Sequence, residues 1–401
     1  MSKKILARRL TIQYGFLQSM YWMAFCVIMG FATVFLLYKD FEGQQIGMIL
    51  AAANICAVFL QPIIASFADR SKKISLKTII SFLALIVIFL TALLLIVPIN
   101  KIIIASLFIL IGTVVLTIQP LLNSLIFEYI NRGLAINYGL ARGLGSLSFA
   151  GMSFVLGFIV SRFSPAVLPY LYIFFYSFIL VIAYSFKMPK VLKKEYNEKL
   201  SASSTTKKSV KLTELLHFFK RYHNLHLLLL AVCFLFIFHN IINTYLIQIM
   251  LNVGGTDTDF GISLALAASV ELPTMMGFAY LVRKIKGSTL LKISAVFFTV
   301  KAIVFLVAPS VGIIYIGQIL QALSFALYIP ASVYYMNAIM EPNDRIKGQA
   351  IIMVAMTLGG VFGNLIGGFF LDTFTIFVML VAGVIFSLMG TLLLCYSVKA
   401  I

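Results

Sequence analysis

The chain has 401 residues, of which 62% are hydrophobic and 11% are charged, and its formal net charge at pH 7 is +18. A soluble protein would be about half apolar and a quarter charged, so this composition excludes a soluble fold and predicts an all-α polytopic membrane protein. The positive charge does not indicate nucleic-acid binding, because the basic residues form short clusters between apolar runs, where cytoplasmic loops are expected.

Apolar runs of the length that a bilayer requires, about 20 residues each, recur along the whole chain. We identify twelve of them, at residues 13–38, 45–67, 76–97, 102–126, 138–160, 167–187, 225–250, 260–282, 289–308, 311–338, 347–371 and 374–397. The first run is too long for a signal-peptide core and has no clear small-residue cleavage site, so we expect it to be retained as a helix. The sequence thus predicts twelve transmembrane helices in a multi-pass protein of the cell membrane.

Lysine and arginine concentrate at the N-terminus and in every second loop. The basic groups are Lys3, Lys4, Arg8 and Arg9, then Arg70, Lys72 and Lys73, then Arg132, residues 187–221, the group Arg283, Lys284 and Lys286, and finally Arg345 and Lys347. The intervening loops hold only Lys39, Lys101 and Arg162. By the positive-inside rule, both termini are therefore expected in the cytoplasm.

One long polar segment divides the chain into two sets of six spans. Residues 190–222, "KVLKKEYNEKLSASSTTKKSVKLTELLHFFKRY", have a Ser/Thr/Lys centre that is typical of a flexible cytoplasmic linker. The halves 1–189 and 223–401 look related, since "EYINR" (128–132) and "EPNDR" (341–345) each precede a glycine-rich helix. We therefore predict two pseudo-symmetric six-helix bundles, an architecture in which secondary transporters bind substrate between the halves.

Three charged residues, Arg142, Glu271 and Lys301, lie four or more residues from either end of a predicted span, and so well inside it. Charges within the membrane tend to mark substrate or ion pathways. Glu271, near the bilayer midplane, is our candidate for proton coupling; the alternative is a fixed pair with Lys301 that only joins two helices. Two cations against one carboxylate leave an excess positive charge, which favours an anionic substrate held partly by Arg142. Alternatively, Arg142 extends toward the cytoplasm or pairs with Glu128.

Polar and aromatic residues at helical spacing complete the predicted substrate site. Its members are Trp22, Asn123, Arg142 with Phe149 on the same face, His239 with Asn243, Lys301 and Gln321. These side chains could bind the polar groups of a solute, or they could form ordinary hydrogen bonds and packing contacts between helices.

Several stretches resemble the major facilitator superfamily, and within it the group that includes lactose-permease-like oligosaccharide:proton symporters and phenylpropionate porters. They are "FLQPIIASFADRSKK" (59–73), "YGLARGLGSLSF" (138–149), "SVELP" (269–273) and "FGNLIGGFFLD" (362–372). The resemblance implies transport by alternating access and places Arg142 at the position of an essential arginine. It also implies that Asp69 and Arg70 form a cytoplasmic gate, although they could simply belong to a solvated turn.

The chain departs from lactose permeases at residues that bind sugar or couple protons. Ser124 stands where those permeases have a sugar-binding acid, and Phe149 where a tryptophan stacks on the sugar. Lys301 replaces an arginine, and Gln321 and Ser324 replace a histidine and a glutamate of the proton relay. Glu271 is then the midplane acid that remains for coupling.

No catalytic motif supports an enzyme: the four histidines form no H-E-x-x-H pattern, and neither G-x-S-x-G nor a Walker motif is present. We expect no cofactor, metal site or nucleic-acid partner, and a monomer whose partners are lipid, a small-molecule substrate and protons. The predicted function is proton-coupled symport of a small polar organic solute (a sugar, a sugar derivative or an organic anion). The alternatives are a proton-coupled drug or metabolite exporter and an uncoupled uniporter.

Overall fold

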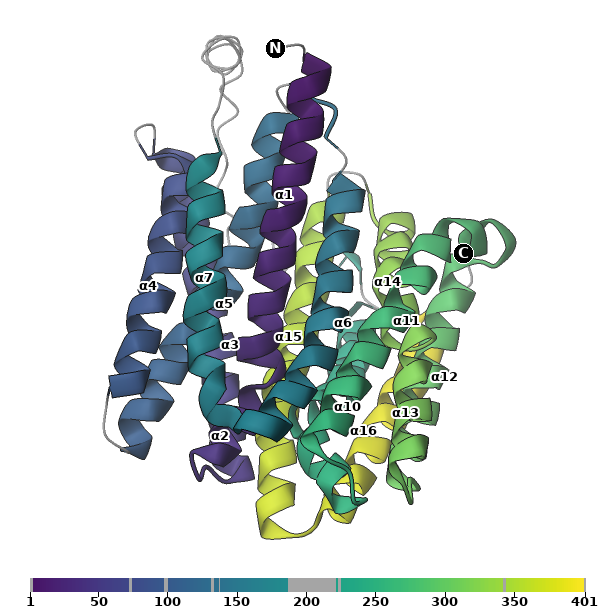
Figure 1. Ribbon diagram of the computed structural model, residues 1–401. Coiled ribbons are helices and arrows are strands. Elements are labelled where there is room, and N and C mark those ends of the chain that lie inside the picture. Colours follow the sequence, from purple (N-terminus) through teal and green to yellow (C-terminus); the bar gives the residue numbers. More distant parts are fainter. Residues whose placement is uncertain are drawn as a thin grey trace.

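The computed structural model describes residues 3–71, 74–96, 100–130, 133–136, 138–186, 221–222, 225–341 and 344–399. Within these ranges the chain is helical throughout, with short turns between the helices (Figure 1). Eleven described helices are long and apolar enough to cross a membrane, and the bent helix pair in residues 5–38 raises the number to twelve. The predicted all-α polytopic fold is thereby confirmed.

The N-terminal half begins with a long helix that is interrupted near its end. Its elements are α1 (Lys3–Phe25), the π-helical turn η1 (Cys26–Gly30), α2 (Ala32–Tyr38), α3 (Gly43–Arg70), α4 (Leu76–Ile96), α5 (Lys101–Ile130), α6 (Tyr138–Phe163), the 3₁₀ turn η2 (Pro165–Val167) and α7 (Leu168–Ser185). Helix α1 starts at Lys3, ten residues before the predicted span, because the helix continues through the basic segment that precedes the apolar run.

The C-terminal half repeats this arrangement. Its elements are α10 (Leu225–Asn252), α11 (Asp257–Lys284), α12 (Gly287–Leu306), α13 (Val311–Ile319), the 3₁₀ turn η3 (Leu320–Ala322), α14 (Phe325–Ile339), α15 (Arg345–Thr373) and α16 (Ile376–Ser397). The predicted spans match these helices to within a few residues, but the tenth span is broken at η3, which hydropathy cannot detect because both parts are apolar.

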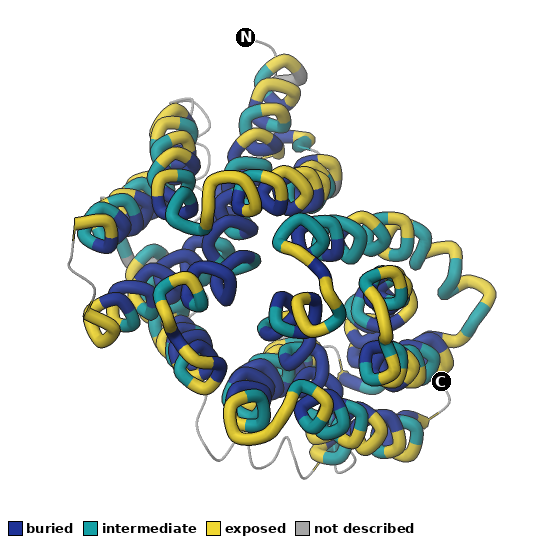
Figure 2. The backbone as a smooth tube through the Cα atoms, turned by 60° about the horizontal axis from the view of Figure 1, so that its bottom comes forward, coloured by how far each residue is buried: buried dark blue, intermediate teal, exposed yellow. Residues whose placement is uncertain are grey.

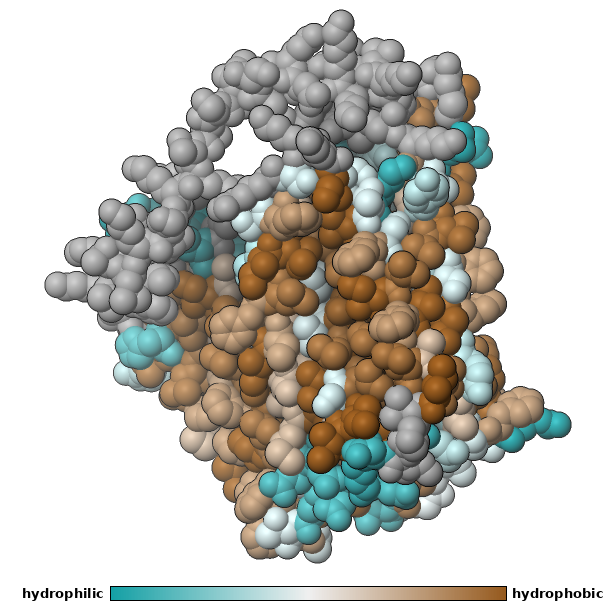
Figure 3. Space-filling view, turned by 90° about the vertical axis from the view of Figure 1, so that its left-hand side faces the viewer, coloured by the Kyte–Doolittle hydropathy of each residue, from teal (hydrophilic) through white to brown (hydrophobic). Residues whose placement is uncertain are grey.

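The outer surface of the bundle is apolar, as contact with lipid requires. Seen obliquely from below, buried residues lie toward the middle of the bundle and exposed residues on its outer faces (Figure 2). A broad hydrophobic band covers the side formed by the N-terminal half, with a hydrophilic patch at its lower edge (Figure 3). Large side chains exposed on this half include Phe82, Phe89, Phe158, Phe174 and Val181. This surface fits a multi-pass membrane protein.

A proline inside a helix leaves one backbone carbonyl without its usual donor, and the fold compensates for this at Pro120 of α5. The unpaired carbonyl is that of Leu116, and it accepts a hydrogen bond from Gln61 Nε2 of α3 at 3.0 Å. An unsatisfied carbonyl in hydrocarbon would cost several kcal/mol, so this bond stabilises the contact between α3 and α5.

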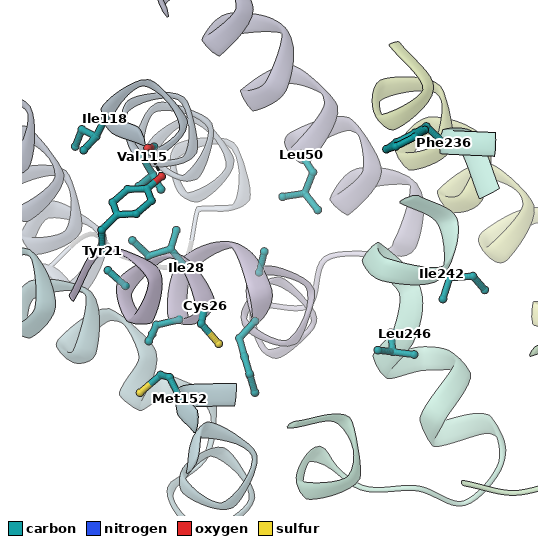
Figure 4. Close-up of a cluster of buried hydrophobic side chains, with 14 of the residues drawn as sticks. Tyr21, Cys26, Ile28, Leu50, Val115, Ile118, Met152, Phe236, Ile242 and Leu246 are labelled. Atoms are coloured by element: carbon teal, nitrogen blue, oxygen red, sulfur yellow. Dashed lines mark hydrogen bonds between the residues drawn. The ribbon is translucent and has the colours of Figure 1, made fainter. Parts of the chain in front are cut away.

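The first helices of the two halves are both distorted near the same end. The chain bends by 44° between η1 and α2, and α10 has non-helical backbone angles at Tyr245 (φ −104°, ψ 16°). Side chains from several helices surround η1, and just before this turn the Tyr21 hydroxyl of α1 donates to the Val115 carbonyl at 3.1 Å (Figure 4). Distorted transmembrane helices are frequent next to the binding sites of transporters.

Two helix crossings join the halves, and they are built alike. Helix α6 crosses α11 and helix α15 crosses α3, each through glycines. A Cβ on Gly157 of α6 would lie 3.0 Å from the Asp257 carbonyl oxygen, and a Cβ on Gly368 of α15 would lie 2.5 Å from the Gly43 carbonyl oxygen. Only glycine allows backbones to approach this closely, and the correspondence supports the predicted pseudo-symmetry.

Both chain ends lie on the upper side of the bundle in Figure 1, which we call the terminal face; the opposite side is the distal face. All hydrogen bonds between the halves that join two described residues lie at the distal face; the pairs are Thr33–Thr244, Gly43–Asp372, Gln44–Asp372 and Tyr245–Gly43. Toward the terminal face, a Cβ on Gly143 of α6 or Gly277 of α11 would meet no atom within 4 Å. The halves are therefore closed against each other at the distal face.

Candidate functional site

Three side chains of α1, spaced four residues apart, form a polar ladder on one face of the helix. Trp22 Nε1 donates to Gln18 Oε1 at 3.1 Å, and Gln18 Nε2 donates to Asn123 Oδ1 of α5 at 3.2 Å. The Tyr14 hydroxyl also donates to Asn123 Oδ1, at 3.3 Å. The predicted site residues Trp22 and Asn123 thus belong to one hydrogen-bonded network, which Gln18, buried at the centre, holds together.

Arg142 extends from the first turns of α6 toward this ladder. Its guanidinium carbon lies 4.3 Å from the centre of the Trp22 ring, a cation–π contact. One guanidinium nitrogen donates to Ser146 Oγ at 3.2 Å. Phe149, on the same face of α6, meets the Trp22 ring edge-on at 6.4 Å between centroids. The structure thus brings together four of the predicted residues: Trp22, Asn123, Arg142 and Phe149.

No carboxylate of a described residue forms an ion pair with Arg142 within 4.0 Å. The proposed alternative in which Arg142 pairs with Glu128 is therefore wrong for this conformation. Because a guanidinium carries five N–H donors and only one of them is used by Ser146, Arg142 retains donors for a ligand.

In the C-terminal half, a second cluster joins Lys301 of α12 to Glu271 of α11 through Gln321. Lys301 Nζ donates to Gln321 Oε1 at 2.6 Å and to Gln318 Oε1 at 3.1 Å. Gln321 Nε2 donates to Glu271 Oε1 at 3.0 Å. Lys301 is only 1% exposed, so these hydrogen bonds replace the water that a charged amine would otherwise require.

The alternative in which Glu271 and Lys301 form a direct pair is not what the structure shows. The structure describes both side chains, and no ion pair within 4.0 Å joins Glu271 to Lys301. The Gln321 amide lies between them, with its oxygen toward the amine and its nitrogen toward the carboxylate. Glu271 is thus bridged to the buried cation while keeping one carboxylate oxygen outside this bridge.

Gln321 projects from the break in the tenth span. Residues Leu320–Ala322 form a 3₁₀ turn between α13 and α14, and Ser324 has irregular backbone angles (φ −91°, ψ −95°). Such interruptions within a helix often mark functional hinges. The side chain that bridges Glu271 and Lys301 therefore lies on the least regular backbone of its span.

The two clusters face each other across the crossing of α6 and α11. Arg142 and Glu271 are close enough for their opposite charges to interact, although they are more than 4.0 Å apart. Both side chains are partly exposed, so both can meet a ligand between the halves.

His239 and Asn243 of α10 bond to each other, with 2.9 Å between the imidazole Nε2 and the amide nitrogen. The His239 ring stacks on Phe325 at 4.7 Å between centroids and is largely buried among aromatic rings. Both residues lie in the half that holds Lys301, and their predicted role in substrate binding stays a prediction.

The predicted gate lies outside what the structure describes. Asp69 and Arg70 are the last residues of α3, but their side chains are not described, and neither are residues 72–73. Of the predicted linker 190–222, only residues 221–222 are described. Among the described residues, no group of three or more His, Cys, Asp or Glu side chains could hold a metal ion.

Sequence reasoning missed two members of the site, Tyr14 and Gln18. The sequence feature that could have identified them is their four-residue spacing, which places Tyr14, Gln18 and Trp22 on one helix face. Trp22 is predicted as a site residue from the sequence, whereas Tyr14 and Gln18 on the same helix face are not.

Comparison with known proteins gives one family and a set of transporters. The MFS_1 like family matches residues 11–381. The maltose permease of Geobacillus stearothermophilus is 24% identical over 363 residues, covering 89% of this chain and 86% of that protein. The crystal structure of the nucleoside transporter NupG has a TM-score of 0.77 at 14% identity, covering 99% of this chain and 98% of that one. The D-xylose-proton symporter has a TM-score of 0.69 at 14% identity, with the same coverage.

Proposed function

Because the chain belongs to the MFS_1-like family, and so to the major facilitator superfamily of membrane transporters, we propose that it carries a small polar organic solute across the cell membrane by proton-coupled symport. The observation that supports this most directly is the pair of polar clusters, one in each half, that face each other across α6 and α11. Alternating access exposes such a site first to one side of the membrane and then to the other.

Sugar-type or nucleoside-type solutes suit the N-terminal cluster. Amide, hydroxyl and guanidinium groups can bind several hydroxyl groups at once, and the faces of Trp22 and Phe149 can pack against a ring. The maltose permease, the nucleoside transporter and the xylose symporter are named for solutes of this kind, which supports this choice of class.

Glu271 is the proposed proton carrier. Its carboxylate is the described acidic group that faces both Arg142 and the bridge to Lys301. Adding a proton to Glu271 removes one negative charge from a site that also holds two cations. Proton binding therefore changes the electrostatic field felt by a solute beside Arg142, which is a physical basis for coupling.

Uptake into proteoliposomes tests the proposed function. Purified protein is reconstituted, and radiolabelled maltose, xylose, uridine, their acid derivatives and a lipophilic cation are supplied with and without an inward proton gradient. We expect at least one solute to accumulate only with the gradient. Equilibration without accumulation would indicate a uniporter, and export of lipophilic cations against their gradient would indicate an exporter; either result overturns the symport proposal.

One observation favours an anionic solute as a second candidate. Arg142 forms no ion pair with a described residue, and the two cations of the site face a single acid. A carboxylate on the solute would use the free guanidinium donors in a two-point contact. We expect a uronic acid to displace a bound reporter at lower concentration than its parent sugar does, and Arg142→Lys to reduce this preference. Equal potency of acid and parent sugar would contradict the anion.

A further inference from the structure

The carboxylate of Asp372 binds the beginning of a helix that belongs to the other half of the molecule. Asp372 lies near the end of α15, and its two oxygens accept hydrogen bonds from the backbone nitrogens of Gly43 at 3.0 Å and Gln44 at 2.6 Å. Both nitrogens belong to the first turn of α3. The first N–H groups of a helix have no partner within the helix, and they carry the positive end of its dipole. Asp372 thus makes two charge-assisted bonds between the halves.

Three neighbouring contacts hold α3 and α15 in the register at which Asp372 makes these two bonds. The Tyr245 hydroxyl lies 2.6 Å from the Asn364 carbonyl oxygen of α15 and 3.2 Å from the Gly43 carbonyl oxygen of α3. A Cβ on Gly368 would lie 2.5 Å from that same Gly43 oxygen. Tyr245 is fully buried and is the residue at which α10 is distorted. Three helices therefore meet where Asp372 binds α3.

The equivalent crossing on the other side of the molecule has no such carboxylate. There the beginning of α11 is capped by its own half: the Thr256 hydroxyl and Asp259 carboxylate bond to each other, at 2.7 Å, and to each other's backbone nitrogens. The nearby end of α6 carries Arg162. The Asp372 contact is therefore not required by the fold, since the matching crossing forms without it.

From these contacts we propose that Asp372 is an electrostatic latch that holds the distal face closed and sets how readily the transporter opens there. Opening the distal face separates α15 from α3, so both bonds must break and water must replace them. The acid acts on the equilibrium between the two access states and does not touch the solute. This inference goes beyond the proposed function, because it holds for any solute and with or without proton coupling.

Spin-label distance measurements test the latch without a substrate. In a background without the four native cysteines, one label pair is placed at Ile102 and Phe377, exposed residues at the distal ends of α5 and α16. A second pair at Tyr184 and Tyr396, exposed at the terminal ends of α7 and α16, reports the opposite motion. The matched control is Asp40→Asn, which removes a distal carboxylate from a residue with φ 60°, a conformation that asparagine tolerates.

For Asp372→Asn we expect a new, longer distance between the distal labels and a shorter one between the terminal labels. Because Asp372 is exposed, the equilibrium constant for distal opening should rise about 2- to 5-fold, while Asp40→Asn should leave both distributions unchanged. Asp372→Glu, which keeps the charge, should restore part of the closed population. Unchanged distances in Asp372→Asn, or the same change in Asp40→Asn, would overturn the latch. Because no solute is present, failure of the symport proposal leaves this result unaffected.

Discussion

The two halves of the molecule share one helix arrangement but treat their central charges in opposite ways. In the N-terminal half, Arg142 touches an aromatic ring and one hydroxyl, and no described acid pairs with it. In the C-terminal half, Lys301 is almost fully buried, and the Gln321 amide connects it to Glu271. One half therefore keeps donors available for a ligand, while the other uses its donors within the protein.

From this difference we infer separate tasks for the two halves. A cation with free donors beside Trp22 and Asn123 is suited to bind a solute. An acid that is hydrogen-bonded to a neutral amide, with a buried cation beyond it, is suited to gain and lose a proton without losing its position. We therefore expect substitutions in the N-terminal cluster to change affinity, and substitutions in the C-terminal cluster to change coupling and stability.

The largest effect is expected from Lys301→Met, because it leaves Glu271 without the buried cation to which Gln321 connects it. Removing one partner of a buried charge network costs about 3–5 kcal/mol, so the folded protein should unfold at a clearly lower temperature in detergent. Adding Glu271→Gln should recover much of the loss, because the unpaired charge is then gone as well. Thermal unfolding of the three variants measures this, and a double variant that is no more stable than Lys301→Met would show that the two charges are not coupled.

The next largest effect is expected from Arg142→Gln, which should weaken the binding of the solute. Hydrogen bonds to charged groups contribute about 1.5–3 kcal/mol, so Arg142→Gln should weaken solute binding roughly 10- to 100-fold. Its unfolding temperature should change little, because Arg142 forms no ion pair with a residue that the structure describes. Ligand titration by calorimetry measures the affinity, and an unchanged dissociation constant would remove Arg142 from the site.

A smaller effect distinguishes two buried glutamines, one in each half of the molecule. Gln18 bonds to both Trp22 and Asn123, whereas Gln318 accepts a bond from Lys301 of the C-terminal half. Leaving a buried partner unpaired costs about 1–3 kcal/mol, so Gln18→Leu should weaken binding roughly tenfold. Gln318→Leu should change affinity much less and mainly lower stability. If both variants lose the same affinity, the division between the halves is wrong.

The smallest effect is expected from Trp22→Phe. The smaller ring loses the indole N–H bond to Gln18 and part of the cation–π attraction to Arg142, which contributes about 0.5–2 kcal/mol. Binding should weaken a few-fold, and the dependence of transport on the proton gradient should stay as in the wild type. A change in coupling with unchanged affinity would contradict this prediction, because it would show that Trp22 takes part in coupling and not in solute binding.

The sequence was sufficient for the spans and for the intramembrane charges. Hydropathy identifies a helix that contacts lipid because its composition is constrained over about 20 residues. The charges Arg142, Glu271 and Lys301 are conspicuous because they are costly in the membrane. The bridge through Gln321 was not predictable, because it depends on how α11, α12 and the break at η3 meet in space. The same holds for the contact of Asp372 with α3, which joins residues more than 300 positions apart.

The most direct test of the two-task account is solute exchange compared with proton-driven accumulation, measured on the same proteoliposomes. Glu271→Gln should still exchange internal for external solute at a substantial rate, and should fail to accumulate it when a proton gradient is imposed. Arg142→Gln should lose both activities at low solute concentration. Loss of exchange in Glu271→Gln together with normal accumulation in Arg142→Gln would contradict the assignment of binding to one half and coupling to the other.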